Sequence, residues 1–465
     1  MLFSFKSKKL FFIILFLLGI LIFFGLWNIV SGGYDKQNKI ILFLKEVIPT
    51  KISRKVRDTV FIVPDLKERN KFLSLQVEKY EQGLDGKLFS DKIFISKKNK
   101  KEYLLKEFFL PFPRLDTRLG WAATKNSKRA HYLEILDDKV FLISGLGETI
   151  YFNKENIKKK KLNQKKIKNN ISAILEENKA ELIGIRDLYH EDGFVYITIQ
   201  HKDKYGFTIN VYRANVDYSE LKFELFFKTG EYWPTYNVFS GGRLEKFKDN
   251  KILFSIGYSK KYEAPQNKSS LLGKIISIDK KTKKYELISY GHRNPQGLHY
   301  LNKHNIIINT EHGPKGGDEI NFNFLKNSEP PNFGWPVSSY GVPYPGEEKI
   351  FEGKGWLKKS HDENGFNEPI RYYTPSIGIS ELAYLPKGKS PDGKEYLFVS
   401  SLRAASIYVI KLNDELDKIL DEDRIYFPQH RIRDIEHDGE NNVFLILFEY
   451  TPSIGVLSFQ NFPNS

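Results

Sequence analysis

The chain has 465 residues, of which 41% are hydrophobic and 14% aromatic, so it can bury a sizeable core and is not a disordered polyelectrolyte. Its formal net charge of +15 comes mostly from lysines spread along the chain. No nucleic-acid reader motif accompanies them, so we expect no nucleic-acid partner. The absence of cysteine excludes disulfides, thiolate metal sites and cysteine nucleophiles.

The first predicted element is a hydrophobic segment near the N-terminus. Leu10–Val30 is 21 residues long, contains no charge and follows a lysine-rich tip, so it is long enough to cross a bilayer as a helix. A cleaved signal peptide is the alternative, but its apolar stretch is usually shorter, and Ser31–Gly33 is only a weak cleavage site. We therefore expect residues 1–33 to form a cytoplasmic tip and a single-pass anchor in the inner membrane. The positive-inside rule then places the rest of the chain in the periplasm.

Residues 34–109 follow as a juxtamembrane region. Apolar positions at helical spacing in Lys39–Asp58 and Leu66–Gly86 predict two short helices, the first interrupted at Pro49 and the second ended by glycine. Neither segment carries visible chemistry, so we expect a stalk or a partner-binding surface there.

From residue 110 to residue 465 the pattern changes to strands. One unit recurs six times: a tight turn of Asp, Asn or Gly, followed by a short run of β-branched and aromatic residues. The runs begin, at steps of 54, 58, 54, 90 and 47 residues, at Val140, Phe194, Ile252, Ile306, Tyr396 and Val443. A period of about 40 to 60 residues with several strands per unit is typical of four-stranded propeller blades. The sequence therefore predicts an all-β, six-bladed β-propeller, with an insertion in the long step around Asn327–Lys349.

Two motifs in the fourth unit carry the chemistry. They are "GHRNPQGL" at Gly291–Leu298 and "TEHGPKGGDEIN" at Thr310–Asn321, separated by one predicted strand and followed by "PNFGWP" at Pro331–Pro336. In this order and spacing the chain, over roughly Leu133–Phe459, resembles the glucose/sorbosone dehydrogenase family. The resemblance implies a six-bladed propeller that uses pyrroloquinoline quinone (PQQ) and calcium to oxidise an aldose sugar or a related alcohol.

The resemblance also implies roles for individual residues. PQQ is a flat ortho-quinone with three carboxylates, and guanidinium groups suit both carboxylate pairing and the negative charge that develops on a reduced quinone. The family's quinone-binding pair corresponds to Arg293, the catalytic residue that the resemblance assigns, and Asn294. Its carboxylate-binding cations correspond to Arg403, Arg431 and Arg433.

The calcium ligands that the resemblance implies are the backbone carbonyls of Gly313 and Pro314. A hard cation accepts carbonyl oxygens readily, and glycine lets the backbone approach closely. Asp318 and Glu319, which follow in the same loop, are expected to fix the loop rather than to act in catalysis.

The sequence departs from the family at its general base. That histidine precedes a Gly-Gly-Arg turn, and here the corresponding string is "FSGGR", which puts Phe239 at the base position. Phenylalanine cannot accept a proton, and a general base typically supplies about 10² to 10⁴-fold of rate. His292 and His312 belong to their own motifs and do not replace the base, while the nearby alternatives are Tyr236, Asn237 and Glu181.

Two functions therefore stay open. The first is a membrane-anchored, PQQ-dependent dehydrogenase of a small sugar or alcohol, with its base elsewhere. The second is a non-catalytic propeller that binds PQQ, a glycan or a protein on the same scaffold. Retention of the arginines and of the calcium loop favours the first function, and Phe239 favours the second.

Overall fold

The computed structural model describes residues 85–112, 130–326, 329–428, 430–449 and 452–459. The predicted membrane anchor lies outside these residues, as do the predicted juxtamembrane helices up to residue 84. Among the helices in the described part of the chain, none combines the length and the apolar character needed to cross a membrane.

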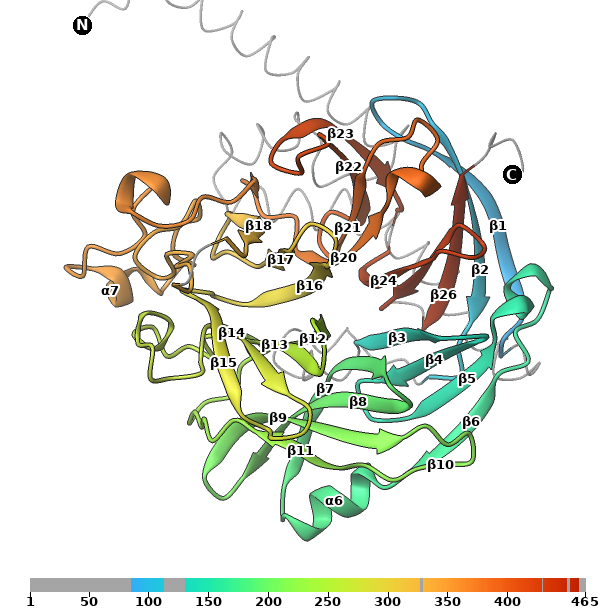
Figure 1. Ribbon diagram of the computed structural model, residues 1–465, viewed down its shortest axis with the longest axis horizontal. Helices are drawn as coiled ribbons and strands as arrows, with labels where there is room; N and C mark the ends of the chain where they lie inside the picture. Colours follow the sequence, from blue (N-terminus) through green and yellow to red (C-terminus); the bar gives the residue numbers. More distant parts are fainter. Residues whose placement is uncertain (1–84, 113–129, 327–328, 429, 450–451, 460–465) are drawn as a thin grey trace, which may run out of the picture. The chain divides into compact units, whose positions relative to one another are not determined.

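Six sheets, each built mainly of antiparallel neighbours in the chain, stand around a common axis (Figure 1). The first sheet contains β3 (His131–Leu136), β4 (Lys139–Ser144), β5 (Thr149–Asn153), β6 (Lys165–Asn169) and the short parallel strand β10 (Glu220–Leu221). The second contains β7 (Glu181–Glu191), β8 (Phe194–Asp203), β9 (Gly206–Asn215) and β11 (Glu224–Lys228). The third contains β12 (Gly241–Phe247), β13 (Lys251–Ile256), β14 (Lys274–Asp279) and β15 (Tyr285–Tyr290).

The remaining sheets complete the ring. The fourth contains β16 (Pro295–Leu301), β17 (Ile306–Glu311), β18 (Asp318–Phe324) and β19 (Arg371–Tyr373). The fifth contains β20 (Ile379–Leu385), β21 (Tyr396–Ser401), β22 (Ser406–Leu412) and β23 (Ile419–Tyr426). The sixth contains β24 (Ile432–Asp438), β25 (Val443–Phe448), β26 (Ser453–Phe459), β2 (Glu102–Phe109) and β1 (Leu88–Ile95). Two α-helices, α6 (Ile171–Glu177) and α7 (Glu348–Phe351), lie in the connections.

The six-bladed propeller predicted from the sequence is confirmed. Each of the six predicted apolar runs is the second strand of one blade: β4, β8, β13, β17, β21 and β25. The turns before them contain residues in the left-handed region, such as Asp137 at φ 48° and Asn305 at φ 54°. Asp and Asn tolerate that conformation better than most residues, which explains why these turn residues recur ahead of each run.

The sixth blade begins earlier in the chain than the boundary expected at residue 110. β2 pairs with β26 from Tyr103↔Phe459 to Phe109↔Ser453, and β1 pairs with the other edge of β2. Residues 88–109, which the sequence placed in the juxtamembrane region, therefore join the first and last parts of the propeller in one sheet. The side chains of Tyr103 and Leu105 are almost fully buried in this sheet.

Apolar side chains fill the interfaces between neighbouring blades. Ile183 and Phe254, for example, belong to one cluster between the second and third blades, and Leu142 and Leu445 belong to another between the first and sixth. Both faces of a blade are thus covered, so its middle strands are almost continuously apolar. The burial of these faces is the main contribution that holds the blades together.

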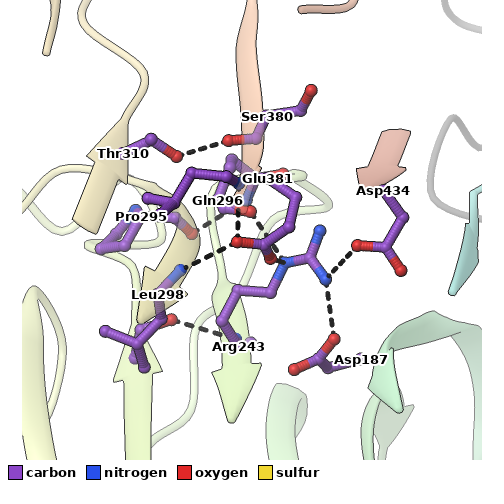
Figure 2. Close-up of polar contacts among 12 residues, drawn as sticks. Asp187, Arg243, Pro295, Gln296, Leu298, Thr310, Ser380, Glu381 and Asp434 are labelled. Carbon is purple, nitrogen blue, oxygen red and sulfur yellow. Dashed lines mark hydrogen bonds and ion pairs between the residues drawn. The ribbon is translucent and has the colours of Figure 1, made fainter. Parts of the chain in front are cut away.

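Arg243, on β12, ties the six inner strands together at the axis (Figure 2). Its contacts to the other inner strands are an ion pair with Asp187 (Nη1–Oδ1 2.8 Å), an ion pair with Asp434 (Nη1–Oδ1 3.0 Å), an ion pair with Glu381 (Nε–Oε2 2.9 Å), a hydrogen bond to the Gln296 carbonyl oxygen (2.7 Å) and a cation–π contact with the Tyr132 ring (4.9 Å). Three carboxyl groups surround one guanidinium group in this buried cluster. Burial raises the pKa of Asp187 to about 7 and that of Glu381 to about 8.

Candidate functional site

Four of the predicted site residues lie where two inner strands begin. Arg293 and Asn294 directly precede β16, and Arg431 directly precedes β24. The backbone N–H of Gly241, the first residue of β12, donates to Asn294 Oδ1 at 3.2 Å. Arg433 Nη1 donates to the side-chain oxygen of Gln296 on β16 at 2.9 Å. These contacts bring the beginnings of three inner strands to one end of the axis.

Arg293 is almost completely buried, with 2% of its surface exposed. Its Nη1 donates to the carbonyl oxygen of His312 at 2.8 Å, and its backbone N–H donates to Glu311. Its Nε is buried and has no hydrogen-bond partner among the described residues. A buried guanidinium N–H without an acceptor is costly, which points to an acceptor supplied by a ligand.

Asn294, the next residue, is oriented by hydrogen bonds to its side-chain oxygen. Its Oδ1 accepts hydrogen bonds from the Gly241 N–H at 3.2 Å and from Gln296 Nε2 at 3.3 Å. Two donors on the oxygen fix which way the amide faces. The amide nitrogen of Asn294 donates to no described residue, so it is available to an acceptor on a ligand.

Arg431 and Arg433 share one carboxylate. Glu449, whose side chain is fully buried, accepts from Arg431 Nε at 2.7 Å and from Arg433 Nε at 2.8 Å. Both arginines thus face the same carboxylate, although Arg431 precedes β24 and the pairing of this strand is irregular between Ile432 and Asp434.

Arg403 and the predicted calcium loop meet around Ser376. Arg403 is exposed, and its Nη1 donates to the Ser376 carbonyl oxygen at 3.2 Å. The Ser376 hydroxyl donates to Asp318 Oδ2 at 2.7 Å, and Asp318 Oδ1 accepts the N–H of Gly313 at 3.2 Å. Asp318 also accepts the backbone N–H groups of Gly378 and Ile379, so it links this loop to the beginning of β20.

The loop itself offers backbone oxygen atoms. A Cβ on Gly313 would lie 2.1 Å from the carbonyl oxygen of Gly317, so only glycine fits there. The carbonyl oxygens of Gly313 and Pro314 accept no hydrogen bond from any described residue. No group of three or more His, Cys, Asp or Glu side chains in the described ranges is arranged to hold a metal ion. A cation at this loop would therefore bind to carbonyl oxygens, which calcium accepts.

His312 reports on the electrostatics of the site. Burial and the neighbouring charges of Arg433, Arg293 and Arg431 lower the pKa of its imidazole to about 4, against the opposing effect of Asp318. Three of the predicted arginines thus act on one side chain. The result is a site with positive potential in which His312 is neutral at physiological pH.

Phe239 lies two residues before β12, beside Arg293. The centroid of its ring is 4.8 Å from the guanidinium carbon of Arg293. Of the alternatives to the base, Asn237 is held by hydrogen bonds to Thr235, Ser259 and Phe239. Tyr236 is exposed, with its ring beside Phe207, and Glu181 is exposed at the beginning of β7. His292 is likewise engaged, because its two ring nitrogens contact Ser289 and Glu311, both at 2.8 Å.

The sequence missed Arg186, on β7, which adds another cation to the site. Its Nε donates to Gln200 Oε1 at 2.9 Å, and the nearby charge of Arg433 adds to burial in lowering the pKa of its guanidinium group. A Cβ on Gly242 would lie 2.4 Å from Arg186 Cβ, so the Gly-Gly pair before Arg243 admits this side chain. The segment "GIRD" around Arg186 was the available signal.

The sequence of the chain matches known proteins over the propeller. The family model described as "Glucose / Sorbosone dehydrogenase" matches residues 132–451. Aldose sugar dehydrogenase YliI of Escherichia coli is 27% identical over 281 residues, covering 57% of this chain and 72% of the relative.

Two solved structures share the fold. A glucose dehydrogenase superposes with a TM-score of 0.59 at 20% identity, covering 72% of this chain and 98% of that one. The PQQ-bound form of aldose sugar dehydrogenase from Streptomyces coelicolor superposes with a TM-score of 0.52 at 18% identity, covering 70% and 93% of the two chains. At these identities the superpositions show a common fold alone.

Proposed function

This chain belongs to the glucose/sorbosone dehydrogenase family, and from that premise we propose that it is a PQQ-dependent oxidoreductase of an aldose sugar or a related alcohol. The proposal includes calcium as a second cofactor. The printed name of the E. coli relative and the PQQ-bound state of the Streptomyces structure support the substrate class and the cofactor.

The observation that carries the proposal is the gathering of guanidinium groups at one end of the axis. Arg431 and Arg433 both contact Glu449, while Arg293 and Arg403 form no ion pair with a carboxylate among the described residues. A ligand with several carboxylates complements such a group of cations, and bidentate arginine contacts hold carboxylates in a defined orientation.

The donors present fit PQQ at both of its ends. Arg403, Arg431 and Arg433 would hold its carboxylates. Arg293, with its Nε unpaired, and the Asn294 amide nitrogen would donate to the quinone oxygens. Gly313 and Pro314 would hold calcium through their unpaired carbonyl oxygens.

When bound, PQQ would supply the two-electron oxidant for the carbinol group of the substrate. The chain contributes orientation and charge. Arg293 is desolvated and positively charged, so it stabilises negative charge on an oxygen acceptor more strongly than an exposed arginine would. Glu311 fixes the backbone of Arg293, and His292 fixes Glu311, so this donor is held in place before a ligand arrives.

A second function is favoured by Phe239. With a phenyl ring at the base position, the site could bind PQQ or another polycarboxylate without oxidising a sugar. In that case the propeller would be a binding module built on the enzyme scaffold.

We extend the proposal to the location of the protein. The 21-residue apolar segment Leu10–Val30 and the lysines before it support an inner-membrane anchor with a cytoplasmic N-terminus and a periplasmic propeller. Fractionation of cells, followed by protease treatment of spheroplasts, tests this. Degradation of the propeller in intact spheroplasts supports the location, and protection contradicts it.

The experiment that tests the function is a titration of the purified protein with PQQ in the presence of calcium, followed by dye reduction with a panel of aldoses and alcohols. Binding with dye reduction supports the dehydrogenase. Saturable binding without reduction of any substrate supports the binding module. If PQQ does not bind, the protein is neither a PQQ-dependent dehydrogenase nor a PQQ-binding module.

A further inference from the structure

Arg293 lies in a cage of aromatic rings. The rings, with the distances from their centroids to the guanidinium carbon, are Phe239 at 4.8 Å, Trp335 at 5.1 Å, Tyr258 at 5.4 Å and Tyr344 at 6.0 Å. All four lie within the range of cation–π attraction, which is strongest for a desolvated cation. The cage explains how a guanidinium group without a carboxylate partner is 98% covered, since only 2% of Arg293 is exposed.

The cage is assembled from three separate parts of the chain. Phe239 precedes β12, and Tyr258 follows β13. Trp335 and Tyr344 belong to the long connection between β18 and β19, which is the insertion that the sequence predicted. Trp335 and Tyr258 also pack against each other, with ring centroids 5.4 Å apart. The insertion thus completes the wall around Arg293.

The backbone of Phe239 is fixed on both sides. Its N–H donates to Asn237 Oδ1 at 3.0 Å, and its carbonyl oxygen accepts the N–H of Ser259 at 3.0 Å. A Cβ on Gly257 would lie 2.2 Å from that carbonyl oxygen, so the two segments are packed as closely as glycine allows. These contacts fix the point from which the ring extends, and the ring itself packs against Tyr258, with centroids 5.7 Å apart.

An arginine can be oriented by a carboxylate or by the faces of aromatic rings. These two surroundings differ in how much charge and how many N–H groups of the arginine remain for a ligand. A carboxylate partner would neutralise the charge and occupy the N–H groups. Ring faces hold the guanidinium group from the sides, while its charge and its unpaired Nε remain. A phenyl ring, unlike an imidazole, also adds no second positive charge beside Arg293 at low pH.

We propose that Phe239 is a positioning residue, whose ring covers the Arg293 guanidinium group and orients it toward the electron-rich oxygen of a bound ligand. The proposal rests on the proposed function, in which that ligand is PQQ. At the position where the family has a general base, this chain thus has a residue that positions the neighbouring arginine.

The first test needs no cofactor. Phenylglyoxal modifies accessible arginines, and mass spectrometry of the peptide containing Arg293 gives the rate at that residue. The variant Phe239→Leu keeps apolar bulk but removes the aromatic face, and Phe239→Tyr restores that face. The matched control is Phe351→Leu, because Phe351 packs in the same aromatic cluster, against Tyr262 and Trp335, and has no described contact with Arg293.

We expect modification of Arg293 to be about tenfold faster in Phe239→Leu, because roughly one desolvated cation–π contact is lost. Phe239→Tyr and Phe351→Leu should react at the wild-type rate. An equal rate in the wild type and Phe239→Leu overturns the proposal. Thermal unfolding of each variant shows whether a faster rate comes from general loss of the fold, in which case Phe351→Leu would react faster as well.

The second test measures PQQ binding to the same four proteins in the presence of calcium. Phe239→Leu should bind about tenfold more weakly and shift the absorption spectrum of the bound cofactor, and Phe239→Tyr should restore both. Unchanged affinity in Phe239→Leu overturns the proposal even if Arg293 becomes reactive. If the wild type does not bind PQQ, the proposed function is wrong, and the proposal is then decided by the reactivity of Arg293 alone.

Discussion

Replacing Arg243 with methionine should destabilise the propeller strongly. The guanidinium group makes ion pairs of 2.8, 3.0 and 2.9 Å with Asp187, Asp434 and Glu381, and all four side chains are largely buried. Removing one partner of a buried ion pair typically costs about 3–5 kcal/mol, because it leaves an uncompensated charge. The change in volume adds less than about 1.5 kcal/mol. We therefore expect the free energy of unfolding to fall by about 3–5 kcal/mol at pH 8.

The loss should shrink in acid. Burial already raises the pKa of Asp187 to about 7 and that of Glu381 to about 8, so these carboxyl groups take up protons near pH 5, and a protonated carboxyl group does not need the guanidinium partner. Equilibrium unfolding in guanidinium chloride at pH 5 and pH 8, followed by tryptophan fluorescence, measures both values.

The control is Lys246→Met, on the same strand, whose side chain is 62% exposed and which should cost less than about 1 kcal/mol. A loss below about 1 kcal/mol for Arg243→Met at pH 8, or an equal loss at both pH values, would show that the ion pairs of Arg243 do not stabilise the propeller in this way.

Three further predictions concern pH, anion binding and calcium. The folded pKa values of Asp187 and Glu381 lie above their ordinary values, so the stability that these groups contribute is complete near pH 4 and is lost as the pH rises through 7 to 8. The unfolding midpoint of the double variant Asp187→Asn/Glu381→Gln should therefore change less between pH 5 and pH 8 than that of the wild type. Equal changes in the two proteins would contradict this. Arg431→Ala should weaken PQQ binding by about tenfold or more in a fluorescence titration, through loss of a charge-assisted contact. Arg371→Ala should not, because Arg371 pairs with Glu422 between the outer strands β19 and β23 of the fourth and fifth blades. Calcium together with PQQ should raise the melting temperature of the wild type, and Gly313→Ala should abolish this rise. The alanine Cβ would lie 2.1 Å from the Gly317 carbonyl oxygen and displace the loop. An undiminished rise in the variant would exclude this loop as the calcium site.

The repeating part of the fold could be predicted because its signal is local. Each second strand follows a turn of Asp, Asn or Gly, and that chemistry is visible within about ten residues of sequence. The strands β1 and β2 could not be placed in the same way. Their partner β26 lies at the other end of the chain, as in the pair Tyr103↔Phe459, and no local pattern indicates which sheet they join.

The residues of the candidate site also divide into those with a local signal in the sequence and those without one. The motifs supplied Arg293, Asn294 and the loop at Gly313, since each lies in a short string with a recognisable spacing. Glu449 could not be assigned, because its pairing with two arginines of another strand depends on tertiary structure.

The surroundings of Phe239 were hidden for a related reason. The sequence showed which residue stands at the base position, but not what it touches. The four rings around Arg293 come from three segments, and only the folded chain brings them together.

A crystal structure of the protein with PQQ and calcium would locate the cofactor. We expect PQQ at the end of the axis where β16 and β24 begin, with its carboxylates within hydrogen-bond distance of Arg431 and Arg433 and a quinone oxygen at Arg293. We also expect calcium on the carbonyl oxygens of Gly313 and Pro314. PQQ bound elsewhere on the propeller, or these arginines remaining without contact to it in a fully loaded crystal, would show that the proposed site is wrong.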